Sequence, residues 1–228
     1  MAIVYYFNVD EIRDCEIREY LQHLPAFMQQ EVMKYRNTID QKSRLAARLM
    51  LCESLRTSGI DDWQDKWRKN VHNKPFIEGW KPFNISHSGK LVVFSYADGS
   101  IGVDIEKVQT IQHGELMRYF HAEEQEFIRS AANKLDSFYE VWVKKEAFLK
   151  ATGTGLVNGL NACNCILKNV SYQGDCWHFH VIDIHPDYKS CLCTLNEKEP
   201  ITISAFRFER AQYFPNINPP SSNPLSYM

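Results

Sequence analysis

The chain has 228 residues, of which 44% are apolar and 24% charged, and its formal net charge is -2. This is the composition of an ordinary globular protein, and the near-neutral charge excludes a general electrostatic attraction to nucleic acid or membranes. The 7 cysteines are an odd number, which argues against a secreted disulfide framework. The chain has no signal-peptide pattern and no apolar run near the roughly 20 residues of a membrane span. We therefore expect a reduced, cytoplasmic protein.

The first third of the chain predicts a strand followed by helices. The clearest element is an amphipathic helix over 40–59, in which apolar residues recur at steps of three and four and Gly59 marks the end. Residues 60–82 predict a loop with a short strand. Before the long helix we expect an opening strand over 2–9 and a helical stretch over 11–35.

The rest of the chain predicts a hairpin, two helices and an antiparallel meander. Asp98-Gly99 is a strong hairpin dipeptide between two apolar runs, so the segment 90–106 predicts a β-hairpin. Two helices are expected over 115–132 and 134–153. From about residue 160 onward, four alternating segments predict antiparallel strands.

Two Cys-x-Cys pairs allow two interpretations. Cys163 with Cys165, and Cys191 with Cys193, have the four thiols that a structural zinc site would need. Alternate residues of a strand share one face, however, and a free cysteine packs like a small apolar side chain. We favour buried strand faces over a zinc site.

Two acids occupy alternate positions of an apolar strand. In "IGVDIE", Ile101, Val103 and Ile105 face a core, which places Asp104 and Glu106 together on the other face. Adjacent carboxylates repel and are costly to bury unless a cation joins them. Mg²⁺ takes one or two carboxylates together with substrate phosphates. The alternative is an exposed strand face with both acids in water, which is the commoner arrangement for this spacing.

A predicted helix carries a second group of charged residues. Glu146 and Lys150 are four apart in "WVKKEAFLK", so they share one helix face with Phe138 and Trp142. The aromatic residues should turn this face inward and partly bury the Glu146 carboxyl, which would raise its pKa and suit it to act as a general base. The alternative is an exposed Glu–Lys pair that contributes little to stability.

The segment "NISHSG" (84–89) predicts a tight polar turn that exposes backbone N–H groups and the imidazole of His87. Such turns can hold anions. A serine hydrolase is another interpretation. However, the chain has no Gly-x-Ser-x-Gly elbow, and a serine adjacent to its histidine does not have triad geometry. A polar turn without a ligand explains the segment equally well.

Four segments occur in an order that resembles one family: "FNISHSG", "IGVDIEK", "RYFHAEE" and "FYEVWVKKEAFLKATGTGL". Together they resemble the Sfp-type 4′-phosphopantetheinyl transferases, and the match is dense from about Lys74 to Leu156. The resemblance implies an α/β (α+β) fold of two similar halves related by a pseudo-twofold axis, with the active site between them. We expect the halves to cover 1–100 and 101–214, followed by an irregular tail over 215–228.

The resemblance also implies a reaction. The 4′-phosphopantetheine arm of coenzyme A is transferred to a serine hydroxyl of an apo acyl or peptidyl carrier protein, and 3′,5′-ADP is released. Glu146 resembles the general base that takes the serine proton, and Lys150 resembles a phosphate ligand that protonates the departing ADP. The family implies a monomer that accepts several carriers, and neither nucleic acid nor a membrane is an expected partner.

Three acids resemble the Mg²⁺ ligands of the family. Asp104 and Glu106 match the strand motif, and Glu124 is in register with a third acid, although Glu123 lies beside it. In the same segment His121-Ala122 replaces the Ser-Pro that is usual in the family. We therefore expect the following helix to lose a good N-cap.

The remaining expected contacts are with the phosphates and the adenosine of coenzyme A. Lys74, in "NKPF", matches a loop that lies near the adenosine in the family. Arg44 and Arg48 are candidates for the 3′-phosphate because a guanidinium holds phosphate through two parallel hydrogen bonds, and we favour Arg44. The full set of expected coenzyme A ligands is Arg44, Arg48, Lys74, His87, Ser88, Lys145 and Lys150.

Two other functions would use the same residues. One is a non-catalytic protein that binds coenzyme A or a carrier, but a binding protein has no need of a general base. The other is a metal-dependent pyrophosphatase that cleaves coenzyme A with water, but no dedicated water-positioning group is evident in the sequence.

Overall fold

The structure, a computed structural model, describes residues 1–110, 114–155, 160–161 and 163–208. Its strands are β1 (Ala2–Asn8), β2 (Trp67–Lys69), β3 (Pro75–Ile77), β4 (Phe83–Ser88), β5 (Leu91–Ala97), β6 (Ile101–Lys107), β7 (Asn169–Tyr172), β8 (Asp175–Val181), β9 (Tyr188–Thr194) and β10 (Ile201–Ala205). Its helices are η1 (Val9–Glu11), η2 (Asp14–Glu16), α1 (Ile17–Leu21), α2 (Ala26–Met33), α3 (Thr38–Thr57), α4 (Gly114–Met117), α5 (Ala122–Ser130) and α6 (Lys134–Thr152).

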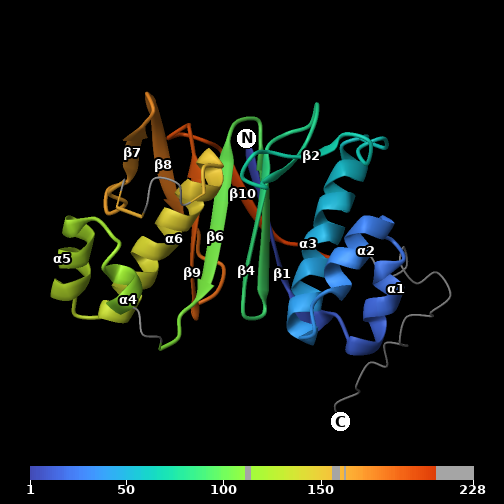
Figure 1. Cartoon of the computed structure of the whole chain (residues 1–228), viewed down its shortest axis with the longest axis horizontal. Coiled ribbons are helices and arrows are strands. Elements are labelled where there is room, and N and C mark those ends of the chain that lie inside the picture. Colours follow the sequence, from blue (N-terminus) through green and yellow to red (C-terminus); the bar gives the residue numbers. More distant parts are fainter. Residues whose placement is uncertain (111–113, 156–159, 162, 209–228) are drawn as a thin grey trace, which may run out of the picture.

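Two four-stranded sheets lie side by side in the middle of the molecule (Figure 1). The first has the strand order β10-β1-β5-β4 and the second the order β6-β9-β8-β7, while β2 and β3 form a separate two-stranded ribbon. Helices α1, α2 and α3 lie on the side of the first sheet, and α4, α5 and α6 on the side of the second (Figure 1). Each half therefore combines one sheet with its own group of helices.

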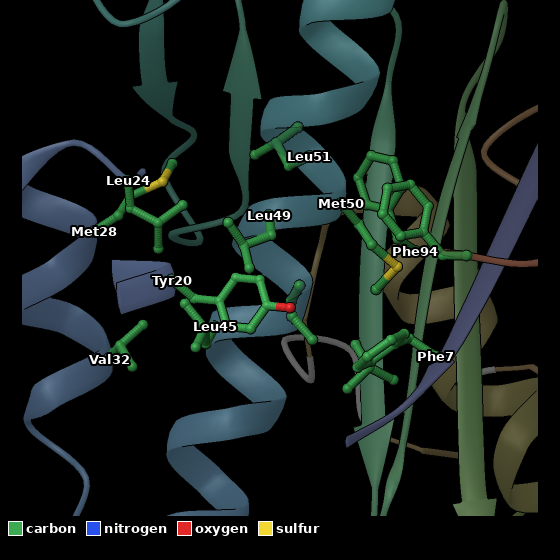
Figure 2. Close-up of a cluster of buried hydrophobic side chains, with 14 of the residues drawn as sticks. Phe7, Tyr20, Leu24, Met28, Val32, Leu45, Leu49, Met50, Leu51 and Phe94 are labelled. Carbon is green, nitrogen blue, oxygen red and sulfur yellow. The ribbon is translucent and has the colours of Figure 1, made fainter. Parts of the chain in front are cut away.

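Helix α3 links the first sheet to the outer helices. Its N-cap is Asn37, whose side chain accepts a hydrogen bond from the Ile39 N–H, and Gly59 just beyond its end has a φ of 70°. Figure 2 shows how its buried side chains are divided: Leu45 points toward the outer helices, and Met50 points toward Phe94 on β5. Apolar residues on both sides of the helix therefore build one core.

Helix α6 packs directly on the second sheet, against β6 and β9. Gly102 makes this close approach possible. A Cβ atom there would lie 2.1 Å from the Ala147 carbonyl oxygen and 2.3 Å from the Ala151 nitrogen, inside van der Waals contact. The helix begins at its N-cap Asn133 and ends at Gly153, which has a φ of 67°. The charged residues of α6 are thereby held against the acids of β6.

The two sheets meet along β4 and β6, which are joined by side chains rather than by a backbone ladder. Asn84, Ser86 and Ser88 lie at alternate positions of β4 and accept hydrogen bonds from backbone N–H groups of β6. The donors and distances are Val103 to Asn84 Oδ1 (2.9 Å), Ile105 to Ser86 Oγ (3.4 Å) and Lys107 to Ser88 Oγ (3.0 Å). Polar side chains therefore line the contact between the two halves.

The predicted hairpin over 90–106 is wrong. Strand β5 pairs with β1 on one edge and with β4 on the other, so neither of its edges is available to β6. Strand β6 instead pairs with β9 and begins the second sheet. The Asp98-Gly99 turn thus carries the chain from one sheet to the other.

The last predicted strand also has a different partner. Strands β7, β8 and β9 form the expected antiparallel meander, but β10 pairs in parallel with β1 in the first sheet. The predicted half over 101–214 therefore includes a strand that belongs to the sheet of the other half. The predicted tail over 215–228 lies outside the described residues.

Three local predictions need correction. The segment "NISHSG" is not a turn, because residues 83–88 form β4 and only Gly89, with a φ of 53°, lies in the turn to β5. The helix expected over 115–132 is broken into α4 and α5. His121 caps α5 through its Nδ1, which accepts the Glu123 N–H at 3.3 Å, so the expected loss of an N-cap did not occur.

The cysteines of the two Cys-x-Cys pairs are buried in one apolar cluster with Trp177 and Phe179. Burial raises the pKa of Cys191 to a point far above neutral pH, which disfavours a thiolate. In the described part of the chain no group of three or more His, Cys, Asp or Glu side chains is arranged to hold a metal. No described helix is both long enough and apolar enough to cross a membrane.

Candidate active site

Asp104 is at the centre of the candidate site. Its side chain is only 2% exposed, and its Oδ1 accepts hydrogen bonds from Ser86 Oγ at 2.7 Å and from Lys150 Nζ at 2.6 Å. Its Oδ2 is also buried but has no hydrogen-bond partner among the described residues. Burial raises the pKa of Asp104, and the Lys150 ammonium opposes this shift. A buried carboxylate oxygen without a partner is a position that a cation would fill.

Glu106 lies two residues farther along the same face of β6. Its Oε2 accepts a hydrogen bond from Ser88 Oγ at 2.7 Å. Burial raises the pKa of Glu106, the bond from Ser88 lowers it, and the negative charge of Asp104 raises it further. The two acids therefore share one face, as their spacing predicted, and are close enough to influence each other's ionisation.

Glu146 reaches the same region from α6. With Lys150, Lys74 and Asn84 it lines a cavity of about 320 Å³. Burial raises the pKa of Glu146, and the negative charge of Asp104 raises it further, while Lys150 opposes the shift. Lys150 both lines this cavity, beside Glu146, and binds Asp104, so it connects the strand acid to the cavity that the helix acid lines.

Arg44 and Arg48 line a second cavity, of about 250 Å³, on the α3 side of the first sheet. The Arg44 guanidinium lies 3.8 Å from the ring centroid of Tyr35, and Arg48 forms an ion pair with Glu31 at 3.1 Å. The Nε atoms of both arginines are buried without a hydrogen-bond partner in the described chain. Unused guanidinium donors beside a cavity suit a phosphate.

His87 connects the two cavities electrostatically. It alternates with Ser86 and Ser88 on β4, so its side chain lies on the opposite face of the strand. Burial lowers the pKa of His87, and the positive charges of Arg44 and then Lys150 lower it further. A neutral imidazole near two cationic groups can donate or accept a hydrogen bond at a phosphate.

Glu124 and Lys145 do not join this group. Lys145 Nζ lies 2.7 Å from Glu124 Oε2, and the two side chains are 3% and 0% exposed. The Glu124 carboxylate also accepts the His121 N–H at 2.8 Å and the Cys165 N–H at 2.7 Å. Lys145 further donates to the Cys163 carbonyl at 2.7 Å. The structure thus gives other partners to the expected third metal ligand and to an expected phosphate ligand, because both are enclosed in the second half.

Two further expected ligands have other partners. The ammonium of Lys74 donates to the carbonyl oxygens of Ile101, Lys150 and Ala151, so it caps the end of α6. Burial lowers the pKa of Lys74 to about 8. The hydroxyl of Ser88 has one hydrogen, and this hydrogen is donated to Glu106 rather than to an open cavity.

Three residues beside the acids were not among the expected site residues: Asn84, Ser86 and Gly102. A signal for them is visible in the sequence, because the alternation Asn-x-Ser-x-Ser in β4 has the same period as Gly-x-Asp-x-Glu in β6. Recognising it requires knowing that the two strands lie side by side, which their sequence separation does not reveal.

Comparison with known proteins identifies the family. A model described as 4′-phosphopantetheinyl transferase superfamily matches residues 100–203, and one described as 4′-phosphopantetheinyl transferase, N-terminal, matches residues 13–98. The 4′-phosphopantetheinyl transferase gsp of Aneurinibacillus migulanus is 32% identical over 178 residues, which are 77% of this chain and 68% of that protein. The chain belongs to the 4′-phosphopantetheinyl transferase superfamily. The predicted family, mixed α/β fold and enzyme class are therefore confirmed.

Other relatives share shorter stretches. The 4′-phosphopantetheinyl transferase Sfp of Bacillus subtilis is 30% identical over 137 residues, 56% of this chain and 61% of that protein. The L-aminoadipate-semialdehyde dehydrogenase-phosphopantetheinyl transferase of Xenopus laevis is 30% identical over 150 residues, 56% of this chain and 48% of that protein. The chain spans about half to two thirds of the length of these relatives.

Proposed function

We propose that this protein transfers the 4′-phosphopantetheine group of coenzyme A to a serine hydroxyl of an apo carrier protein and releases 3′,5′-ADP. One arrangement carries the proposal. Asp104, with a buried oxygen that lacks a partner in the described chain, contacts Lys150, and Lys150 lines a cleft together with Glu146, an acid of raised pKa. Such a group combines charge neutralisation with a proton acceptor, which phosphoryl-group transfer requires.

Asp104 and Glu106 are the residues that would hold Mg²⁺. The unpartnered Oδ2 of Asp104 and the neighbouring Glu106 carboxylate supply the hard oxygen ligands that this ion prefers. The described side chains form no group of three that would hold a metal alone, so the remaining ligands would come from the substrate pyrophosphate and water. When bound, the ion would neutralise charge on the pyrophosphate.

Lys150 and Glu146 have complementary roles at the reacting atoms. The serine oxygen forms a bond to the phosphorus that carries the pantetheine arm, and the bond from this phosphorus to the bridging oxygen breaks. Glu146 accepts the serine proton, because its raised pKa makes the carboxylate a better base. Lys150 neutralises and protonates the leaving phosphate of 3′,5′-ADP.

The cavity beside α3 is the place we assign to the 3′-phosphate. Arg44 and Arg48 offer Nε donors that have no partner in the described residues, and the positive charges of Arg44 and Lys150 both lower the pKa of His87. Two arginines and an imidazole recognise a phosphate through charge and parallel hydrogen bonds. Removal of both guanidinium groups should weaken the binding of coenzyme A more than that of 3′-dephospho-coenzyme A.

The proposed partners are apo acyl or peptidyl carrier proteins, which present the acceptor serine. We further propose that the enzyme acts as a monomer in the cytoplasm. The formal charge of -2 gives no general attraction to an acidic carrier, so recognition requires a local surface.

One assay tests the proposed reaction. The protein is incubated with coenzyme A, Mg²⁺ and a panel of apo carrier proteins, and each carrier is weighed by mass spectrometry. A mass gain of one phosphopantetheine group on at least one carrier is the expected result. Release of 3′,5′-ADP without carrier modification would instead identify a pyrophosphatase, and binding of coenzyme A with neither product would identify a binding protein.

A further inference from the structure

The serines of β4 each contact an acid and the backbone of β6 at the same time. Ser86 Oγ accepts the Ile105 N–H at 3.4 Å and lies 2.7 Å from Asp104 Oδ1. Ser88 Oγ accepts the Lys107 N–H at 3.0 Å and lies 2.7 Å from Glu106 Oε2. The same arrangement thus occurs twice along the contact between the two strands.

The hydrogen of the Ser86 hydroxyl has only one direction available. A hydroxyl oxygen has two lone pairs and one hydrogen. The two lone pairs face the Ile105 N–H and the Lys150 ammonium, whose nitrogen is 2.9 Å away. The hydrogen must then be donated to Asp104 Oδ1. Oδ1 is thereby occupied by Ser86 and Lys150, and Oδ2 is the oxygen without a partner in the described chain.

Ser88 constrains Glu106 together with Trp142. The oxygen of Ser88 accepts the Lys107 N–H, so its hydrogen is directed to Glu106 Oε2, and the Trp142 side chain is a further hydrogen-bond partner of the Glu106 carboxylate. Because the backbone of β6 fixes each serine, the orientation of both carboxylates is set before any ion arrives. Fixed orientation of ligands by neighbouring hydrogen bonds is a main determinant of metal affinity.

We propose that Ser86 and Ser88 are positioning residues that present one oxygen of Asp104 and one of Glu106 to the divalent cation. They act through the carboxylates and touch neither the ion nor the phosphates. This inference rests on the proposed function, because it assigns the cation to these acids. It also replaces the expected contact between Ser88 and phosphate.

Binding of Mn²⁺ in place of Mg²⁺ tests the proposal without measuring activity. Free Mn²⁺ is quantified by electron paramagnetic resonance while the full-length protein is titrated in the presence of coenzyme A. Ser86→Ala and Ser88→Ala should each weaken Mn²⁺ binding by about 10- to 100-fold, the effect of removing a hydrogen-bond partner of a metal ligand. Ser88→Thr keeps the hydroxyl at a half-buried position and should restore affinity.

Ser95→Ala is the matched control. Ser95 is a fully buried serine of the neighbouring strand β5, and its hydroxyl has no partner in the described residues. This variant should bind Mn²⁺ like the wild type. Thermal unfolding of all four variants separates a loss of fold from a loss of orientation, and affinity is compared only on folded protein.

Two results would overturn the proposal. In the first, Ser86→Ala and Ser88→Ala both bind Mn²⁺ with an affinity within about twofold of that of Ser95→Ala. The proposal expects each to bind at least about 10-fold more weakly. The other is a wild-type protein that does not bind Mn²⁺ at all. Failure of the proposed reaction is a separate outcome, because wild-type protein that binds Mn²⁺ in a serine-dependent way but modifies no carrier would keep the positioning role and lose the transfer activity.

Discussion

Helix α6 contains two lysines that each bind a buried carboxylate, and the two pairs are completed in different ways. Lys145 binds Glu124, whose oxygens also accept two backbone N–H groups, so this pair is saturated. Lys150 lines a cavity and binds Asp104, which keeps one buried oxygen without a partner in the described chain. The comparison indicates that the first pair holds the fold together and the second is prepared for a ligand.

The physical difference lies in how the desolvation of each charge is offset. A buried ion pair is stable only when further hydrogen bonds satisfy the remaining lone pairs and protons. The pair of Lys145 and Glu124 meets this condition with protein groups alone. The pair of Lys150 and Asp104 does not, and burial accordingly raises the pKa of Asp104.

The largest expected effect follows from removing Asp104, the acid that has one oxygen without a partner in the described chain. Asp104→Ala should abolish transfer, with a loss of about 1000-fold or more, because it removes a ligand of the cation that would neutralise charge at the reacting phosphates. The fold should persist, since Lys150 already lines the cavity and can reach water when its partner is removed. Carrier mass spectrometry and circular dichroism measure the two properties. Wild-type activity in the variant would remove Asp104 from the site.

The next effect concerns the proton acceptor. Glu146→Gln should leave coenzyme A affinity nearly unchanged and slow turnover by about 100-fold or more, the contribution of a positioned general base. Calorimetric titration with coenzyme A and single-turnover transfer separate binding from chemistry. A collapse of affinity at unchanged fold would identify Glu146 as a ligand rather than a base.

Substitution in the pair of Lys145 and Glu124 should change the stability of the protein. Glu124→Gln leaves the buried Lys145 ammonium without its counter-charge and should lower the free energy of unfolding by about 3–5 kcal/mol. Urea unfolding measures this loss. The double variant Glu124→Gln with Lys145→Met is the control and should recover much of the stability, because no charge stays buried and the amide oxygen still accepts a backbone N–H. Full stability with lost transfer in Glu124→Gln would place Glu124 in the active site instead.

The smallest expected effect is the contribution of Lys74 to the pH dependence of the free energy of unfolding. Burial lowers its pKa to about 8 from an ordinary value of 10.5, so between these values the unfolded chain binds more protons than the folded chain. Lys74 therefore contributes a rise in the free energy of unfolding with increasing pH through this window. The rise should be smaller in Lys74→Met, as measured by urea unfolding from about pH 7 to pH 10. Equal slopes in both proteins would show that Lys74 titrates normally.

The sequence was a good guide to the positions of Asp104, Glu106, Glu146 and Lys150 and a poor guide to those of Glu124 and Lys145. Strand alternation placed Asp104 and Glu106 on one face, and helix periodicity placed Glu146 with Lys150, because both inferences are local. Lys145 adjoins Glu146 in sequence, but neighbouring helix residues point in different directions. Its enclosure with Glu124 depends on the packing of α5, which no local pattern reveals.

The sequence predicted the individual helices and strands better than it predicted which strands pair with each other. The helix over 134–153 followed from apolar periodicity and Gly153. The parallel pairing of β10 with β1 joins residues almost 200 positions apart, and the separation of β5 from β6 contradicts a strong turn signal. Both outcomes are decided by which strand edges are already occupied, and this information is not local.

Binding of Mn²⁺ with coenzyme A in Asp104→Asn and Glu124→Gln tests the contrast between the two pairs most directly. Free Mn²⁺ is measured by electron paramagnetic resonance and normalised to the folded fraction of each variant. We predict that Asp104→Asn loses Mn²⁺ binding while folded Glu124→Gln binds like the wild type. Loss of binding in Glu124→Gln with retention in Asp104→Asn would contradict the assignment of the incomplete pair as the metal site.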